Sequence, residues 1–176
     1  MKLNQQFYII SDTHFGHRNI VKHENRPENY AEIIVKRWNN VVKKDANVLF
    51  LGDLALTNKE DAKRWCDQLQ GNKYMIRGNH DGASESWYQD CGFTTVPPIY
   101  KRFKDKYENY FSVLFTHEPV QDLPEGWFNV HGHVHTKFDR HPELTLHHFN
   151  ACVEVLDYTP KPLYEILDEL RKRPPA

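Results

Sequence analysis

Three short apolar runs in the first half of the chain each stop at a polar stretch. They cover residues 7–10, 48–51 and 74–76. A continuous apolar run of this length that ends at a turn is typical of a buried strand. The first run is followed by Ser11 and Asp12, and the second by Gly52 and Asp53. The pattern therefore predicts buried strands whose ends carry polar groups.

Two helical patterns separate these runs. The first has apolar residues at the i, i+4, i+7, i+8 spacing of an amphipathic helix: Ile34, Trp38, Val41 and Val42. The second begins with the capping-box pair Thr57 and Glu60 and continues along an apolar stripe: Ala62, Trp65, Cys66 and Leu69. Both stripes are interpreted as core faces. The order strand, helix, strand, helix, strand predicts a parallel sheet with right-handed crossovers.

The second half has a different pattern. Aromatic and β-branched runs at 100–103 and 110–115 flank the polar segment 104–109, as in an antiparallel hairpin. Further strands are expected at 127–130 and 149–156. A terminal helix follows, with the apolar face Leu163, Ile166, Leu167 and Leu170. We expect an α/β fold with antiparallel strands in the second half, and the length of 176 residues fits a single domain, 1–176.

Charge and cysteine content exclude several classes of protein. The formal net charge is -1 and no long block of Lys or Arg occurs, which argues against a dedicated DNA-binding module. The three cysteines are scattered, so neither a disulfide framework nor a thiolate zinc site is expected. No apolar signal-peptide core or membrane-length apolar run is present, so the expected location is cytoplasmic, with no membrane partner.

The turn after the third apolar run carries three polar side chains in succession. Asn79, His80 and Asp81 lie between Gly78 and Gly82. Because glycine permits both positive φ and close approach of the backbone, this peptide is expected to turn tightly and direct its polar groups to one place. The turn would then lie at the carboxyl end of a strand, where open α/β sheets bind ligands.

Five expected strand ends carry residues of metal-ligand or acid/base type. They are Asp12 with His14, Asp53, Asn79 with His80, His117, and His133 with His135. On an extended strand, the two side chains of each i, i+2 pair, Asp12/His14 and His133/His135, would point to the same face. Each pair could then bind a metal. Any single one of these residues is more simply explained as a polar loop residue, whereas the ordered set favours a site.

The ordered blocks resemble the calcineurin-like metallophosphoesterases. In this sequence they are residues 11–14, 52–53, 78–81, 116–117 and 132–135. The stretch from Ser11 to His17, with Asn19 and Ile20, is also similar to a small bacterial and phage branch of that superfamily. The resemblance implies a two-sheet β-sandwich flanked by helices, with a dinuclear metal site at the sheet edges.

The resemblance also implies a ligand set. Metal one would take Asp12, His14 and His135, metal two would take Asn79, His117 and His133, and Asp53 would bridge them. Two divalent ions roughly 3.5–4 Å apart can share a hydroxide for in-line attack on phosphorus. Mixed nitrogen and oxygen ligands suit Mn, the first choice here, and also Fe, Zn, Ni or Co.

Other roles follow from the same resemblance. His80 is expected to act as general acid on the leaving oxygen or to stabilise phosphoryl charge. Asp81 is expected to orient its imidazole and favour the protonated form. His17, Arg18 and Asn19 could contact a substrate phosphate, or could equally form a solvated loop and helix start. Arg26 and Arg77 could stabilise phosphoryl charge, but structural hydrogen bonds or ion pairs are favoured for both.

The predicted function is metal-dependent hydrolysis of a phosphodiester or small phosphomonoester, including nucleotide-derived esters. Segments 118–126 and 136–146 follow ligand blocks, so they should rim the site. One alternative is a nuclease of the same superfamily, although the near-neutral charge does not favour a nucleic-acid partner. Another is a non-catalytic scaffold that works through protein contacts. The sequence leaves the oligomeric state open.

Overall fold

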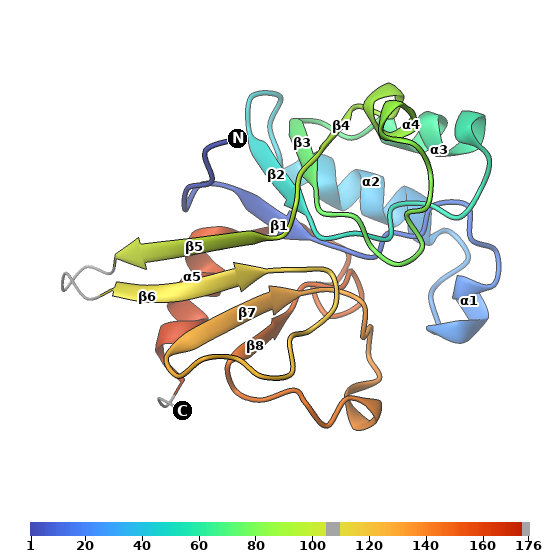
Figure 1. The fold of residues 1–176 in the computed structure, drawn as a ribbon. Coiled ribbons are helices and arrows are strands. Elements are labelled where there is room, and N and C mark those ends of the chain that lie inside the picture. The colour runs from blue at the N-terminus through green and yellow to red at the C-terminus, as the bar shows by residue number, and fades with distance from the viewer. Residues whose placement is uncertain (105–109, 174–176) are drawn as a thin grey trace.

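The computed structural model describes residues 1–104 and 110–173, and its strands form two sheets (Figure 1). The first sheet contains β1 (Tyr8–Ile10), β2 (Asn47–Phe50), β3 (Asn72–Met75), β4 (Phe93–Thr95) and β9 (Lys161–Pro162), in the order β4-β3-β2-β1-β9. The second contains β5 (Ile99–Lys104), β6 (Tyr110–Phe115), β7 (Trp127–His131) and β8 (His148–Asn150), in that order. The predicted two-sheet α/β architecture is confirmed.

Parallel pairing organises the first half. β1 pairs with β2, β2 with β3 and β3 with β4, all in parallel. The crossovers contain α2 (Tyr30–Val41) and α3 (Lys59–Cys66), as predicted. The short helix α1 (Ile20–His23) follows the helix start considered for residues 17–19, whereas α4 (Glu85–Asp90) and β4, which extends the sheet, were not predicted.

The start of α3 differs from the prediction by one residue. The N-cap is Asn58, whose side-chain oxygen accepts a hydrogen bond from the Asp61 backbone N–H at 2.9 Å. The predicted Thr57/Glu60 capping box is therefore wrong. Asn caps helices at least as well as Thr, and Asn58 has the extended backbone that an N-cap requires.

Parallel strands also make up most of the second sheet. The predicted antiparallel hairpin of β5 and β6 is confirmed, but residues 105–109 of its polar connection lie outside the described residues. β6 pairs with β7, and β7 with β8, in parallel, so the expectation of antiparallel strands is wrong beyond the hairpin. The long segments 116–126 and 132–147 allow each strand to start again from the same end of the sheet.

The chain leaves the second sheet earlier than predicted. The strand expected at 149–156 ends at Asn150, and Asp157 and Tyr158 adopt left-handed backbone with φ of 48° and 55°. β9 then pairs antiparallel with β1. The terminal helix α5 (Leu163–Arg171) buries the predicted face, and the one-turn 3-10 helix η1 (Phe138–Arg140) lies in the segment before β8.

Both faces of the first sheet are covered. Ile10, Val48 and Phe50 pack in a core with α2 and α3, while Ile9 and Leu49 face the second sheet and α5 in another. Alternate residues on each strand thus serve different cores, which explains the continuous apolar runs. Trp38 is fully buried as predicted, whereas Trp65 is only partly buried. No helix in residues 1–104 and 110–173 is long and apolar enough to cross a membrane.

Candidate metal centre

The predicted ligands lie together where strands of both sheets end. Asp12, His14 and His135 offer ligand atoms within 4.8 Å of one another, and so do Asp12, Asp53 and His117. Asp12 belongs to both groups, so the groups adjoin. Asn79 Oδ1 lies 2.9 Å from His117 Nε2 and 2.9 Å from His133 Nδ1. The fold therefore brings together all the side chains predicted as ligands.

The backbone at these residues is not extended. Asp12, His14, Asp53, His133 and His135 all have left-handed φ, between 46° and 70°. The prediction that the pairs Asp12/His14 and His133/His135 lie on extended strands is therefore wrong. Left-handed backbone costs a non-glycine residue of order 1–3 kcal/mol and tends to cluster at functional sites. Hydrogen bonds between neighbouring segments hold it here, such as Asp12 N to Gly52 O at 2.9 Å and His133 N to Asp12 Oδ2 at 3.0 Å.

Gly78 is needed for close approach rather than for an unusual φ. A Cβ at Gly78 would lie 2.2 Å from Asp53 Oδ1, and one at Gly132 would lie 2.4 Å from Asp12 Oδ2. Neither glycine has a positive φ, so that part of the expectation for the turn at Gly78 is wrong. At Gly82 a Cβ would meet nothing within 4 Å. Gly52 meets both demands, with φ +98° and a would-be Cβ 2.6 Å from His117 Nδ1.

Several buried polar atoms at the centre have no hydrogen-bond partner among residues 1–104 and 110–173. Asp12 Oδ1 and His14 Nε2 are buried and unpartnered, and lie 3.8 Å apart. Asp53 Oδ2 lies between two imidazoles, 3.5 Å from His14 Nε2 and 3.4 Å from His117 Nε2. Unpartnered buried polar atoms are costly, and a bound cation would satisfy them. The mixed nitrogen and oxygen donors therefore fit a divalent metal ion.

Charge states at the centre also suit a cation. Burial favours the neutral form of Asp53, but the hydrogen bond and charge of His117 outweigh it and hold the Asp53 pKa at about 2. Burial lowers the pKa of His14 to about 3, so its imidazole is neutral. At His117 burial acts in the same direction, but the Asp53 and Asp12 carboxylates raise its pKa to about 9. An anionic carboxylate beside a neutral imidazole, as at Asp53 and His14, is what a metal ion requires. At His117 a metal ion would have to displace the proton that the raised pKa retains.

His80 and Asp81 lie beside this centre in different environments. The His80 side chain is exposed, its ring centroid is 5.6 Å from that of His14, and its backbone N–H donates to Asp53 Oδ1 at 3.0 Å. Asp81 is buried, and its carboxylate accepts hydrogen bonds from the backbone N–H groups of Asp53, Leu54 and Gly78. Among the described residues Asp81 makes no bond to the His80 ring, so the predicted orientation of His80 by Asp81 is wrong.

Comparison with known proteins places the chain in a family. Residues 6–174 match the calcineurin-like phosphoesterases. This chain belongs to the calcineurin-like phosphoesterase family. It is 33% identical over 180 residues to the uncharacterized protein MJ1445 of Methanocaldococcus jannaschii, covering 96% of this chain and 93% of that protein. The Gene 66 protein of Mycobacterium phage L5 is 33% identical over 81 residues, covering 43% of this chain and 39% of the phage protein.

A solved structure shares the fold. The protein of unknown function AQ665 from Aquifex aeolicus superimposes with a TM-score of 0.66 and 25% identity, covering 94% of this chain and 99% of that one. The predicted family and fold are thus confirmed. Apart from the orientation of His80 by Asp81, the roles predicted for individual site residues stay predictions.

Two further residues, Glu154 and Cys152, form hydrogen bonds to predicted ligands. Neither was predicted as a site residue from the sequence. Glu154 Oε1 accepts from His135 Nδ1 at 3.0 Å, which leaves His135 Nε2 facing Asp12. Cys152 Sγ lies 3.2 Å from Asp12 Oδ2 and donates to it. The one sign of Glu154 in the sequence is a lone carboxylate among the apolar residues 151–156.

The two arginines have structural partners, as favoured above. Arg26 is buried, pairs with Glu154 at 2.6 Å, and donates to the backbone carbonyls of Asp12 and Thr13. Arg77 donates to the carbonyls of Asp81 and Ala83. Both side chains therefore hold the site loops in place.

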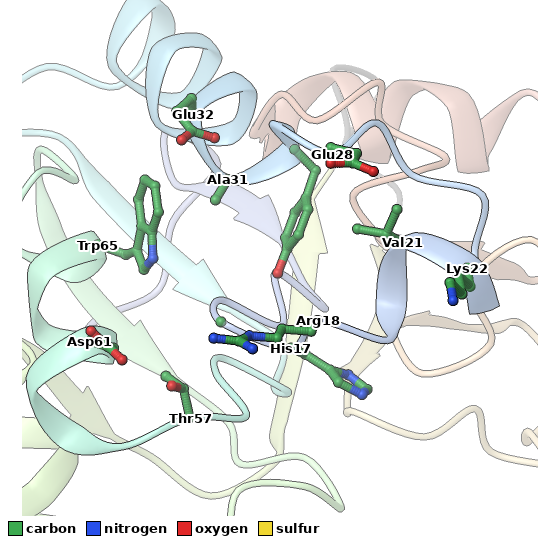
Figure 2. A pocket seen from close by; sticks show the side chains of 12 residues that line it. His17, Arg18, Val21, Lys22, Glu28, Ala31, Glu32, Thr57, Asp61 and Trp65 are labelled. Carbon is green, nitrogen blue, oxygen red and sulfur yellow. The ribbon is translucent and has the colours of Figure 1, made fainter.

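The residues predicted to contact substrate divide into two groups. His17 and Arg18 line a cavity of about 470 Å³ beside the centre (Figure 2), and the His17 ring centroid is 5.6 Å from that of His14. Asn19 does not line this cavity and instead occupies the N-cap of α1. Of the predicted rim segments, 136–146 approaches the site through His141, whose ring centroid is 6.1 Å from that of His133.

Proposed function

We propose that this protein hydrolyses a phosphodiester or a small phosphomonoester with the help of two divalent metal ions, with Mn as the first choice. Asp12, His14 and His135 would hold one ion, and Asn79, His117 and His133 the other, with Asp53 between them. The observation that carries the proposal is the pair of buried, unpartnered atoms, Asp12 Oδ1 and His14 Nε2, beside the Asp53 carboxylate. When bound, two such ions lower the pKa of water and neutralise charge on phosphoryl oxygens.

The protein's own groups prepare the site for this chemistry. Asp53 Oδ2 faces both His14 and His117, while its Oδ1 accepts from the His80 backbone. This fixes the carboxylate in one orientation. Asp81 Oδ2 accepts a hydrogen bond from the Asp53 backbone N–H at 2.6 Å. Asp81 therefore acts on the site through Asp53 rather than through the His80 ring.

The proposed role of His80 is to donate a proton. Its ring is exposed next to the buried His14 ring, so a phosphoester at the centre would meet it on the solvent side. A protonated imidazole there can donate to the leaving oxygen as the bond to phosphorus breaks. A positioned acid of this kind typically contributes about 10²–10⁴-fold in rate.

The test is hydrolysis of bis-p-nitrophenyl phosphate and p-nitrophenyl phosphate by Mn-loaded protein, with metal content measured in parallel. We expect His80→Ala to lower turnover by about 10²–10⁴-fold while metal content stays near wild type. Asp53→Asn should lose both metal and activity. Full activity in His80→Ala would contradict the role as acid, and loss of metal would make His80 a ligand. Metal-loaded wild type that hydrolyses no phosphoester would favour the scaffold alternative.

A further inference from the structure

We infer that the cavity beside the metal centre binds the nucleoside part of the substrate, an inference that rests on the proposed phosphoester hydrolysis. The cavity measures about 470 Å³, within the range of about 300–1,000 Å³ usual for small-molecule sites. It lies between α1, the start of α2, and α3, and Figure 2 shows Arg18 among the side chains that line it. The substrate would then be a nucleotide or nucleotide ester.

The cavity is linked to the reaction centre through His17 and Tyr30, although no predicted metal ligand lines it. His17 lines it and has its ring centroid 5.6 Å from that of the predicted ligand His14. Tyr30 also lines it, and its hydroxyl donates to the His14 carbonyl at 2.7 Å. A phosphoester whose phosphorus lies at His14 and His80 can therefore extend past His17 into the cavity.

One wall suits a flat aromatic group. Trp65 lines the cavity and is only partly buried, with Phe15 stacked parallel to it at 5.8 Å between ring centroids. Figure 2 shows the Trp65 indole on the α3 side, with Val21 on the opposite side. Phe15 fixes the plane of the indole. Aromatic side chains in such a setting stack on nucleobases, and this stacking is worth about 1–3 kcal/mol per base.

Charged groups on the other walls select the chemistry of the occupant. Glu28, Glu32 and Arg18 line the cavity, and none of them has an ion pair or side-chain hydrogen bond within residues 1–104 and 110–173. Ionised carboxylates only accept hydrogen bonds, and guanidinium only donates. All three are exposed, and an occupant that offers both donors and acceptors on a flat apolar body would pair with all of them. A nucleoside with an amino-bearing base meets this demand, whereas a purely anionic or purely apolar group does not.

The experiment compares two diesters with the same leaving group. The Mn-loaded protein is given the p-nitrophenyl ester of adenosine 5′-monophosphate and bis-p-nitrophenyl phosphate, and the ratio of their kcat/KM values is measured. We expect Trp65→Leu to lower this ratio about fivefold or more, and Glu32→Gln to lower it as well. Trp87→Leu on α4 and Glu60→Gln on α3 are matched controls outside the cavity, and should leave the ratio unchanged.

A second readout does not depend on catalysis. Adenosine, which has no phosphate, should quench tryptophan fluorescence in the wild type and in Trp87→Leu but not in Trp65→Leu. Glu32→Gln changes an exposed residue and tests the cavity even where Trp65→Leu folds poorly. An unchanged ratio in both cavity variants, or quenching that persists in Trp65→Leu, would overturn the inference. Quenching that requires Trp65, without hydrolysis of any phosphoester, would leave the cavity assigned and refute the proposed function instead.

Discussion

The absence of a side chain at Gly78 leaves room for the Asp53 carboxylate. A methyl group at Gly78 would lie 2.2 Å from Asp53 Oδ1 and 2.8 Å from His117 Cε1, whereas at Gly82 it would meet nothing within 4 Å. We therefore expect Gly78→Ala to lose most metal binding and hydrolysis, and Gly82→Ala to retain both. Metal content and turnover of the two purified variants provide the check. Equal behaviour of the two would show that the close approach at Gly78 does not matter.

Glu154 makes a second prediction at the residue scale. Its carboxylate joins His135 to the buried Arg26, and so fixes which imidazole nitrogen faces Asp12. Removing a partner that orients a ligand typically weakens metal affinity about 10–100-fold. We expect a loss of this size in Glu154→Gln by calorimetric titration with Mn.

The matched control is Glu169→Gln. Glu169 also pairs with a cation, Lys161, but lies on α5 away from the centre. The affinity of the Glu169→Gln variant for Mn should match that of the wild type. An unaltered affinity for Mn in Glu154→Gln would mean that metal binding by His135 does not depend on the Glu154 carboxylate.

The start of α3 makes a prediction at the scale of an element. Asn58 rather than Thr57 accepts the Asp61 N–H, so Asn58→Ala should destabilise the protein by about 1 kcal/mol. Thr57→Ala should cost less, because its side chain does not cap the helix. Urea denaturation of both variants measures the difference. A larger loss of unfolding free energy in Thr57→Ala than in Asn58→Ala would support the Thr57/Glu60 capping box expected from the sequence.

Helix α3 also shows how an apolar stripe can serve two purposes. Ala62 and Cys66 are fully buried, but Trp65 on the same stripe extends to the cavity edge. Helical spacing places all three on one side and cannot tell core from cavity wall. That distinction depends on how far α1 and α2 cover the stripe.

At the scale of the whole molecule, the residues of the candidate metal centre come from both sheets. Asp12, Asp53 and Asn79 follow strands of the first sheet, while His117 and His133 follow strands of the second. A ligand that binds only the folded state at 100 times its Kd adds about 2.7 kcal/mol of stability. For a chain of this size, this corresponds to about 5–10 °C in Tm.

We therefore expect chelation with EDTA to lower the Tm of Mn-loaded protein by that amount. Calorimetry with and without the chelator measures the shift. In Asp53→Asn the shift should be much smaller, because the carboxylate between the two ligand groups is gone. A Tm that does not respond to chelation in the wild type would show that the two sheets hold together without metal.

The sequence by itself determined β1, β2 and β3 of the first sheet, the α5 face, the family and the residues that gather at the centre. These features depend on local apolar patterns and on short blocks whose order is fixed along the chain. Residues close in sequence carry such signals, so they can be found without knowing what packs against them.

Only the tertiary structure decided the parallel pairing of β6, β7 and β8, the left-handed backbone at Asp12 and His133, and the support of His135 by Glu154. It also decided that Asp81 holds backbone N–H groups rather than the His80 ring. Each of these depends on contacts between segments far apart in the chain, and a contact of that kind forms only when the whole core packs. The free energy that selects it comes from burial and hydrogen bonding across the two sheets, which no local pattern records.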